Sequence, residues 1–219
     1  MAKVEPFESY PFQYEDWFEK NKFTYLSELK AIEEQLPNSG NGIEIGIGSG
    51  RFAAPLGIKI GIEPSKRMRK IAKRRGIVAI GGVAEFLPFR NSLFDFALMV
   101  TTICFLDNIE TAFKEAYRVI RANGQLIIGF VDKDSPIGRL YQKRKKESVF
   151  YKIATFYSVD EVIYYLRKTG FKEFDLSQTI FHHLSAIKDI ETIKDGYGEG
   201  SFVVVKAKKG LIRQNSQFS

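Results

Sequence analysis

Short apolar runs alternate with amphipathic stretches through the middle of the chain. The apolar runs, each long enough for one strand, are Ile43–Ile47, Ile58–Glu63, Ile77–Ile80, Phe94–Thr101 and Gln125–Val131. Residues Ser65–Arg75 and Ile109–Arg121 have the period of a helix, and Gly124 is expected to end the second of these helices. Continuous apolar strands that alternate with helices predict an α/β domain whose mainly parallel sheet is covered on both faces.

The N-terminal part is expected to form a helical cap on this domain. Residues 11–36 carry apolar side chains at helical spacing, and the Pro37–Gly40 stretch ends the pattern. We therefore expect residues 1–36 to cap a single domain that spans residues 37–209.

The end of the chain has a different pattern. A predicted helix over Val159–Thr169 is followed by two apolar segments, residues 171–184 and 200–209, with no helical period between them. Two such strands favour an antiparallel pair at one edge of the sheet. The polar residues 210–219 are expected to form a disordered tail.

Three glycines at alternate positions follow the first predicted strand. They are Gly46, Gly48 and Gly50, with the carboxylate of Glu44 just before them. A phosphate-binding P-loop would need Lys and then Ser or Thr after the last glycine, and a dinucleotide-binding turn would need glycine where Arg51 stands. Because glycine lets the backbone turn sharply and approach a ligand, the pattern favours a nucleoside without a phosphate. The Glu44 carboxylate suits a positively charged group on such a ligand.

An acidic residue also ends the second predicted strand. Glu63 lies 17 residues after Gly46, and a carboxylate at this place can accept hydrogen bonds from both hydroxyls of a ribose. Met68 follows about one helical turn later and is expected to pack near the same ligand.

Five segments in this order resemble the motifs of class I S-adenosylmethionine-dependent methyltransferases of the small-molecule type, similar to ubiquinone and menaquinone C-methyltransferases. They are E-I-G-I-G-S-G (residues 44–50), G-I-E-P-S (61–65), G-G-V-A-E-F-L-P-F (81–89), F-D-F-A-L-M-V-T-T-I-C-F-L (94–106) and A-F-K-E-A-Y-R-V-I-R-A-N-G-Q-L-I-I (112–128). The resemblance covers about residues 40–132. Val83 stands where the family usually has an Asp that contacts the adenine amino group, and only a stub of helix, Arg51–Leu56, fits after the glycines.

The resemblance implies a doubly wound, mostly parallel, seven-stranded Rossmann-like sheet with an antiparallel edge pair. Its site lies at the carboxyl ends of strands one, two and four. S-adenosyl-L-methionine is the implied cofactor, and its methyl group passes to a small molecule by in-line displacement. The sulfonium supplies its own leaving group, so no catalytic triad is required and no catalytic residue is assigned.

The resemblance also implies a set of site residues. Those expected to bind the cofactor are Glu44, Gly46, Gly48, Gly50, Glu63, Pro64, Ser65, Met68, Ala84, Glu85, Phe86 and Thr101. Those expected to face the acceptor are Tyr14, Phe18, Thr102, Phe105 and His182. No metal site is expected.

Other functions stay open at this point. Val83 and the short stub motivate a second hypothesis, a cofactor-binding or regulatory protein of the same fold without catalysis. RNA methylation has in its favour only the formal net charge of +7 and basic stretches such as residues 143–146. A nicotinamide short-chain dehydrogenase would use Tyr-x-x-x-Lys, which begins at Tyr141 and at Tyr164, but its glycine spacing does not fit.

Composition narrows the class of protein further. The 219 residues are 44% hydrophobic and 27% charged, which is typical of a soluble globular domain. The sequence has no secretory signal and no apolar run near the roughly 18 residues of a membrane span. Cys104 is the one cysteine, so an intrachain disulfide is excluded, which favours a cytoplasmic location. The oligomeric state stays open.

Overall fold

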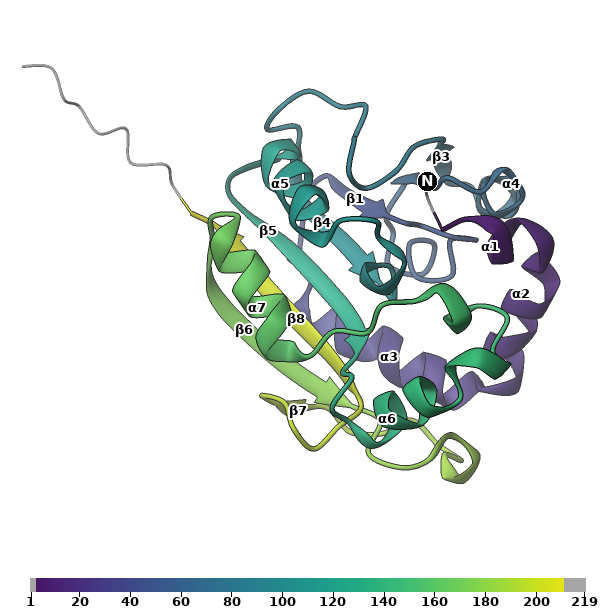
Figure 1. Cartoon of the computed structure of the whole chain (residues 1–219). Coiled ribbons are helices and arrows are strands. Elements are labelled where there is room, and N and C mark those ends of the chain that lie inside the picture. The colour runs from purple at the N-terminus through teal and green to yellow at the C-terminus, as the bar shows by residue number, and fades with distance from the viewer. Residues whose placement is uncertain (1–2, 211–219) are drawn as a thin grey trace, which may run out of the picture.

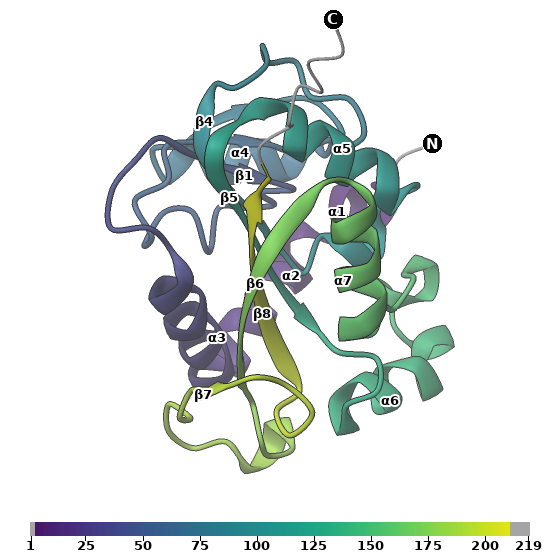
Figure 2. The same cartoon turned by 90° about the vertical axis from the view of Figure 1, so that its left-hand side faces the viewer.

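An eight-stranded sheet forms the centre of the protein, and helices cover both of its faces (Figures 1 and 2). The computed structural model describes residues 3–210. The strands are β1 (Gly42–Ile45), β2 (Ile60–Ile62), β3 (Val78–Ile80), β4 (Phe94–Val100), β5 (Ile120–Val131), β6 (Phe171–Thr179), β7 (Lys194–Asp195) and β8 (Phe202–Lys209). Their order across the sheet is β3-β2-β1-β4-β5-β8-β6-β7.

The strand directions confirm the predicted fold class. Strands β1 to β5 pair in parallel, and β8 is inserted antiparallel between β5 and β6. All seven expected strands are present, and the structure adds β7, which pairs with Ser177 and Gln178 of β6. The strand order reverses between β1 and β4, which is where ligands bind in open α/β sheets.

Helices form a layer on each side of the sheet. They are α1 (Glu5–Ser9), α2 (Pro11–Lys20), α3 (Lys22–Gln35), α4 (Lys66–Arg74), α5 (Ile109–Val119), α6 (Pro136–Lys143) and α7 (Val159–Lys168). In Figure 2, α3 lies on one side of the sheet, and α5 and α7 lie on the other. Ser158 and Glu161 form a capping box that fixes the start of α7.

The N-terminal region is helical as expected, but it is divided differently. The helical period over residues 11–36 is split at Asn21 into α2 and α3, and the sequence pattern did not predict α1. Helix α3 packs on β5, β6 and β8, so it belongs to the helical layer of the sheet. Only α1 and α2 lie over the end of the sheet where the first strands finish (Figure 1). Of the expected disordered tail, residues 211–219 lie outside the described residues.

Gly124 does not end a helix, which corrects the prediction from sequence. Helix α5 already ends at Val119, and β5 begins at Ile120. Phe94 of β4 pairs with Ile120 of β5, whereas Phe96 pairs with Gln125. This shift in register shows that residues 121–124 form a bulge. A Cβ on Gly124 would lie 2.5 Å from the carbonyl oxygen of Asp95. Glycine is therefore required here by close contact with the neighbouring strand.

The expected helical stub at Arg51–Leu56 is also absent, and the segment forms a series of turns. The amides of Ala54 and Leu56 donate to the carbonyls four residues back, at Gly50 and Phe52. The residue between them, at position 55, forms no such hydrogen bond, so the helical pattern is interrupted. Pro55 contributes to this result because it has no amide hydrogen to donate.

The core on the α3 side contains a ring packed directly over a glycine. Phe202 of β8 is fully buried, and a Cβ on Gly129 of β5 would lie 2.7 Å from its ring. The same Cβ would lie 3.4 Å from the side chain of Ile32 on α3. Gly129 thus leaves room for the end of the ring between β5 and α3.

We expect Gly129→Ala to lower the free energy of unfolding by about 1–3 kcal/mol, the usual effect of overpacking a filled core. Because the clash is with one ring, the double variant Gly129→Ala/Phe202→Leu should lose less stability than the sum of its single changes. Urea unfolding of the three variants measures this coupling. Simple additivity would show that a neighbour other than Phe202 limits the space at position 129.

Candidate active site

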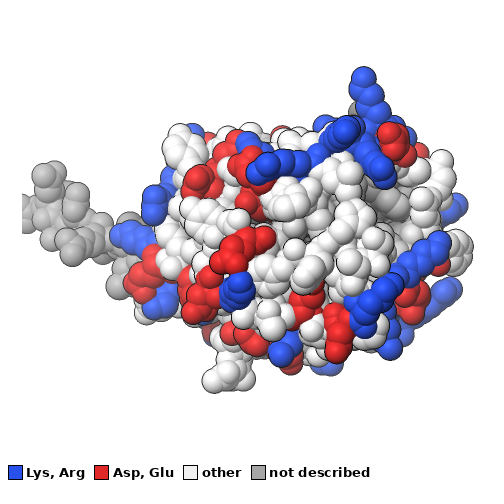
Figure 3. Space-filling model, turned by 90° about the horizontal axis from the view of Figure 1, so that it is seen from below, with Lys and Arg blue, Asp and Glu red and all other residues white. Residues whose placement is uncertain are grey.

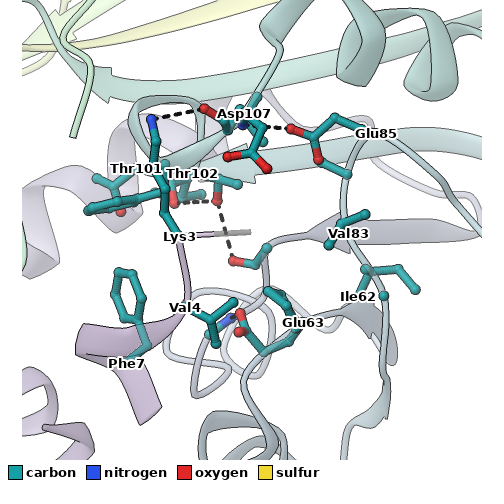
Figure 4. A pocket seen from close by; sticks show the side chains of 18 of the residues that line it. Lys3, Val4, Phe7, Ile62, Glu63, Val83, Glu85, Thr101, Thr102 and Asp107 are labelled. Atoms are coloured by element: carbon teal, nitrogen blue, oxygen red, sulfur yellow. Dashed lines mark hydrogen bonds between the residues drawn. The ribbon is translucent and has the colours of Figure 1, made fainter. Parts of the chain in front are cut away.

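Two adjoining cavities lie at the carboxyl ends of β1, β2 and β4. The first, here called the glycine-loop cavity, has a volume of about 100 Å³ and includes Gly46, Gly48, Glu63, Pro64, Val83 and Ala84 in its lining (Figure 4). The second, the aromatic cavity, has a volume of about 330 Å³ and includes Trp17, Phe18, Phe52, Phe150, Tyr141 and Tyr151. Phe7, Tyr14, Thr101 and Phe105 line both. The cavities therefore meet at these four residues.

The glycine loop after β1 has the conformation that its sequence requires. Gly46, Gly48 and Gly50 have φ angles of 75°, 54° and 83°, which residues with a Cβ rarely adopt. Gly46 and Gly48, both predicted to bind the cofactor, line the glycine-loop cavity. Gly50 does not, because it faces Ile77, whose side chain would lie 2.4 Å from a Cβ. Its role is to let the loop pack closely on the layer behind it.

Glu63 lies in the wall of the glycine-loop cavity, where the sequence places a ribose-binding acid. One of its carboxylate oxygens accepts a hydrogen bond from the Gly48 amide at 3.0 Å, and the other from the Ser65 amide at 2.7 Å. Burial raises the pKa of Glu63 to about 7, although these two hydrogen bonds act to lower it. The carboxylate thus joins the glycine loop to the end of β2 and still faces the cavity.

Glu44 is placed behind the glycine loop and lines neither cavity. Its side chain is buried, and burial raises its pKa well above the usual value. The Ala53 amide donates a hydrogen bond to the carboxylate, while Oε2 has no partner among the described residues. Glu44 therefore acts on the cavity through the loop that it supports.

The residues after Glu63 divide between lining and support. Pro64 lines the glycine-loop cavity, as predicted. Ser65 instead caps α4, since its hydroxyl accepts a hydrogen bond from the Met68 amide. Met68 is fully buried beneath the loop, close to Gly48. The structure therefore places Ser65 and Met68 behind the wall of the cavity.

The segment after β3 supplies one apolar wall. Val83 and Ala84 line the glycine-loop cavity, and Figure 4 shows Val83 beside Ile62. Glu85 also lines it, but its carboxylate accepts hydrogen bonds from the amides of the Asp107–Asn108 turn that precedes α5. Phe86 does not line the cavity, and its side chain is 76% exposed, so only its backbone lies close to this wall.

Two threonines follow β4 at the junction of the cavities. Thr101 has a φ of 48°, which is rare for a β-branched residue and typical of strained functional positions. The Thr102 hydroxyl lies within hydrogen-bond distance of the carbonyl oxygens of Val100 (3.0 Å) and Gly46 (3.3 Å). It thereby links the end of β4 to the glycine loop. Both residues line the glycine-loop cavity, and Thr101 also lines the aromatic cavity.

The N-terminal segment crosses the glycine-loop cavity, which the sequence did not reveal. Lys3 donates a hydrogen bond to the Leu106 carbonyl, and the Phe7 ring packs edge-on against Phe105 at 4.9 Å between centroids. Glu8 accepts a hydrogen bond from the Ser65 hydroxyl at 2.6 Å. Figure 4 shows Lys3, Val4 and Phe7 on the opposite side of the view from Val83 and Ile62, with Val4 beside Glu63. Only the three-dimensional path of the N-terminal segment brings it there, and no motif identifies it.

A charged network holds α2 against the glycine loop. Glu15 of α2 accepts hydrogen bonds from Arg51 (3.0 Å) and Arg75 (2.5 Å). Arg75 also donates to the Ser49 carbonyl within the loop. The helix that carries Tyr14 and Phe18 is therefore fixed relative to the loop.

Four of the five residues predicted to face an acceptor are brought together. Tyr14 and Phe105 line both cavities, Phe18 lines the aromatic cavity, and Thr102 lies beside them. His182 is an exception, which corrects the prediction. Its ring is 71% exposed, pairs with Glu191 at 2.5 Å and lines neither cavity.

The sequence analysis also missed Glu28, an acid in the lining of the aromatic cavity. A signal was present, since Glu28 falls on the apolar face of its helix, three residues after Tyr25 and four before Ile32.

Within residues 3–210, no group of three or more His, Cys, Asp or Glu side chains is placed to hold a metal ion. Over the same residues, none of the helices is long and apolar enough to span a membrane.

Comparisons with known proteins identify the fold and the chemistry. Residues 43–128 match the family model of a methyltransferase domain. An uncharacterized protein of Methanocaldococcus jannaschii, MJ1123, is 44% identical over 203 residues, which are 93% of this chain and 98% of that protein. Both observations cover the glycine loop, Glu63 and the residues after β4.

Solved structures agree with this assignment. A crystal structure of a Thermotoga maritima S-adenosylmethionine-dependent methyltransferase, described as a possible histamine N-methyltransferase, is 53% identical. It covers 94% of this chain and 98% of its own length, with a TM-score of 0.92. Haemonchus contortus phosphoethanolamine N-methyltransferase 2, solved with S-adenosylhomocysteine, has a TM-score of 0.61 over 85% of this chain and 53% of its own. At 14% identity it shows the fold alone. The chain belongs to the class I S-adenosylmethionine-dependent methyltransferases, enzymes whose cofactor is S-adenosylmethionine.

Proposed function

We propose that this enzyme transfers a methyl group from S-adenosylmethionine to a small organic acceptor bound in the aromatic cavity. The observation that supports the proposal most strongly is that this cavity meets the glycine-loop cavity at Phe7, Tyr14, Thr101 and Phe105. Concave, largely apolar and aromatic walls are typical of sites for small molecules. An acceptor in one cavity would thus lie next to a cofactor in the other.

The residues of the glycine-loop cavity fit S-adenosylmethionine. Each Glu63 oxygen accepts one amide hydrogen bond, so lone pairs remain for the two ribose hydroxyls. Gly46 and Gly48 leave room for the amino-acid part of the cofactor beside the backbone. Val83 and Ala84 offer an apolar face to the adenine. Glu44 and Gly50 contribute by holding the loop in place.

The reaction needs few side chains that take part in bond changes. S-adenosylmethionine supplies an electrophilic methyl group and a thioether that leaves with its bonding electron pair as a neutral molecule. The residues at the junction of the cavities hold the acceptor atom in line with the bond between the methyl carbon and the sulfur, and they keep water out. Positioning of this kind contributes up to about 7–11 kcal/mol in ideal cases. An acceptor atom that carries a proton must release it to a base or to water.

Two alternatives from the sequence receive less support. The face in Figure 3 shows Lys and Arg interspersed with Asp and Glu around an uncharged area, whereas an RNA site favours a continuous basic surface. Val83 and the turn at residues 51–56 motivated a binding protein without catalysis, yet Val83 forms part of a continuous cavity wall. The single cysteine supports our proposal of a cytoplasmic location.

We expect Glu63→Ala to weaken the binding of S-adenosylhomocysteine by at least about tenfold, because the ribose hydroxyls lose a charged acceptor, a contact worth about 1.5–3 kcal/mol. Calorimetric titration measures this affinity. Glu34→Gln, an exposed acid on α3, serves as the control and should bind like the wild type. Equal binding by Glu63→Ala and the wild type would contradict the assignment of the ribose site.

The acceptor class can be tested with methyl-labelled S-adenosylmethionine. The enzyme is incubated in parallel with a low-molecular-weight cell extract, with total RNA and with cell protein. We expect label in small molecules only, and none with Glu63→Ala. Label in RNA or protein would overturn the proposed acceptor class. Tight cofactor binding without transfer to any fraction would favour the hypothesis of a regulatory protein.

A further inference from the structure

Glu28 is a buried carboxyl group in the wall of the aromatic cavity. Its residue is 5% exposed, and it lies on α3 with its side chain in the lining of the cavity. In the part of the chain that the structure describes, no side-chain hydrogen bond or ion pair is formed by this carboxyl group. Burial raises the pKa of Glu28 to about 8. The group is thus built into the cavity without a partner among residues 3–210.

An unpaired acid in this position is unfavourable for the fold alone. Burying a carboxylate without a partner costs free energy unless the group becomes neutral. Two other acids of the same helix, Glu33 and Glu34, are exposed to solvent and carry no such penalty. An unfavourable buried group that faces a cavity is a candidate for ligand binding.

Aromatic rings line the same cavity as this carboxyl group. Tyr141 and Tyr151 stack with their centroids 4.7 Å apart, and Trp17, Phe52 and Phe150 contribute further walls. Burial raises the pKa of both tyrosines far above neutral pH, so they stay uncharged. The faces of aromatic rings attract cations. A carboxylate among aromatic rings is therefore selective for a positively charged group with an apolar framework.

Other occupants fit less well. A metal ion would need more oxygen or nitrogen ligands than Glu28 alone, and no suitable group of acids, His and Cys exists in the described residues. An anion would be repelled at every pH at which the Glu28 carboxyl group is ionised. A neutral apolar molecule would fill the walls but leave the carboxyl group unsatisfied.

We infer that the methyl acceptor carries a cationic amine, whose charge pairs with the Glu28 carboxylate while the aromatic walls hold its framework. This inference rests on the proposed function and names the chemical class of its acceptor. The ammonium group takes the place of the missing partner of Glu28. Thr101 and Phe105, at the junction of the cavities, then set which atom of the acceptor faces the cofactor.

Binding of an amine should depend on pH through Glu28. The ionisable side chains that line the aromatic cavity are Tyr14, Asp16, Lys20, Glu28, Tyr141 and Tyr151. The three tyrosines are neutral, because burial raises their pKa values, and Asp16 and Lys20 pair with each other at the solvent-exposed mouth. Among these side chains, Glu28 is therefore the group that gains charge between pH 6 and 9, while Glu63, with a pKa of about 7, gains charge in the adjoining cavity over the same range. Affinity for an ammonium ion should rise over this range until the amine itself loses its proton.

The same group should make the protein less stable as pH rises. The pKa of Glu28 is higher in the folded than in the unfolded chain, so its contribution to stability is lost as pH rises through about 8. We expect Glu28→Gln to melt at least about 2–4 °C above the wild type at pH 9 and within 1 °C or so of it at pH 5. Thermal unfolding at both pH values, with Glu34→Gln as control, measures the difference. An equal difference at both pH values would show that titration of Glu28 is not its cause.

The inference is tested directly by binding, with Trp17 as the reporter. It is the one tryptophan of the chain and lines the aromatic cavity, so its fluorescence responds to an occupant. The probes are 2-phenylethylamine and n-butylamine, each compared with the alcohol of the same skeleton, at pH 8 with saturating S-adenosylhomocysteine. We expect at least one amine to bind about tenfold or more tightly than its alcohol.

Glu28→Gln should remove this preference, so that amine and alcohol bind alike, while Glu34→Gln should keep it. The inference is overturned if neither amine binds more tightly than its alcohol, or if Glu28→Gln retains the preference. Calorimetric titration of S-adenosylhomocysteine with the same variants separates the two proposals. If the wild type does not bind S-adenosylhomocysteine, the proposed function is contradicted. If it binds S-adenosylhomocysteine but binds amines no more tightly than alcohols, only the assignment of the acceptor is contradicted.

Discussion

The carboxylate of Glu63 connects the two turns on which the site depends. It accepts one hydrogen bond from the glycine loop and one from the turn after β2, so the two strand ends are held at a fixed separation. The loop in turn is held by Glu15 through Arg75, and Ser65, whose amide donates to the same carboxylate, caps the start of α4. The Glu63 carboxylate thus sets the shape of the glycine-loop cavity, and it loses solvation because it is buried there. Its raised pKa reflects that loss.

The buried acids of the site are placed where they would favour positively charged reactants. Glu44, Glu63 and Glu28 are all buried, and burial raises the pKa of each. They differ in how their oxygens are satisfied: both oxygens of Glu63 have partners, Glu44 has one orphaned oxygen, and Glu28 has no partner among the described residues. A sulfonium cofactor and an ammonium acceptor would both be favoured by such an arrangement. The fold tolerates these acids because the surrounding sheet and helices are extensively packed.

The sequence alone was sufficient to predict features that depend on residues close together in the chain. The strands, the positive φ angles of the glycines and the place of Glu63 follow from short patterns that need no distant partner. The missed features all depend on packing between remote segments. The path of Lys3 and Phe7 over the cavity, the burial of Glu28 and the exposure of His182 result from the arrangement of α1, α3 and the loop after β6. Gly124 shows the same limit, since a helix stop and a strand bulge share one residue type.

The insertion of β8 between β5 and β6 has a consequence for the synthesis of the chain. Among the strands, β8 leaves the ribosome last, yet it fills a gap inside the sheet and pairs with a neighbour on each side. The first four strands and the cofactor floor can form while the rest is still being made. Helix α3, made early, lacks much of its packing surface until β8 arrives, because it rests on β5, β6 and β8 together. The lining of the glycine-loop cavity ends at Asp107, whereas that of the aromatic cavity extends to Tyr151, so the ribosome completes the residues of the first cavity before those of the second.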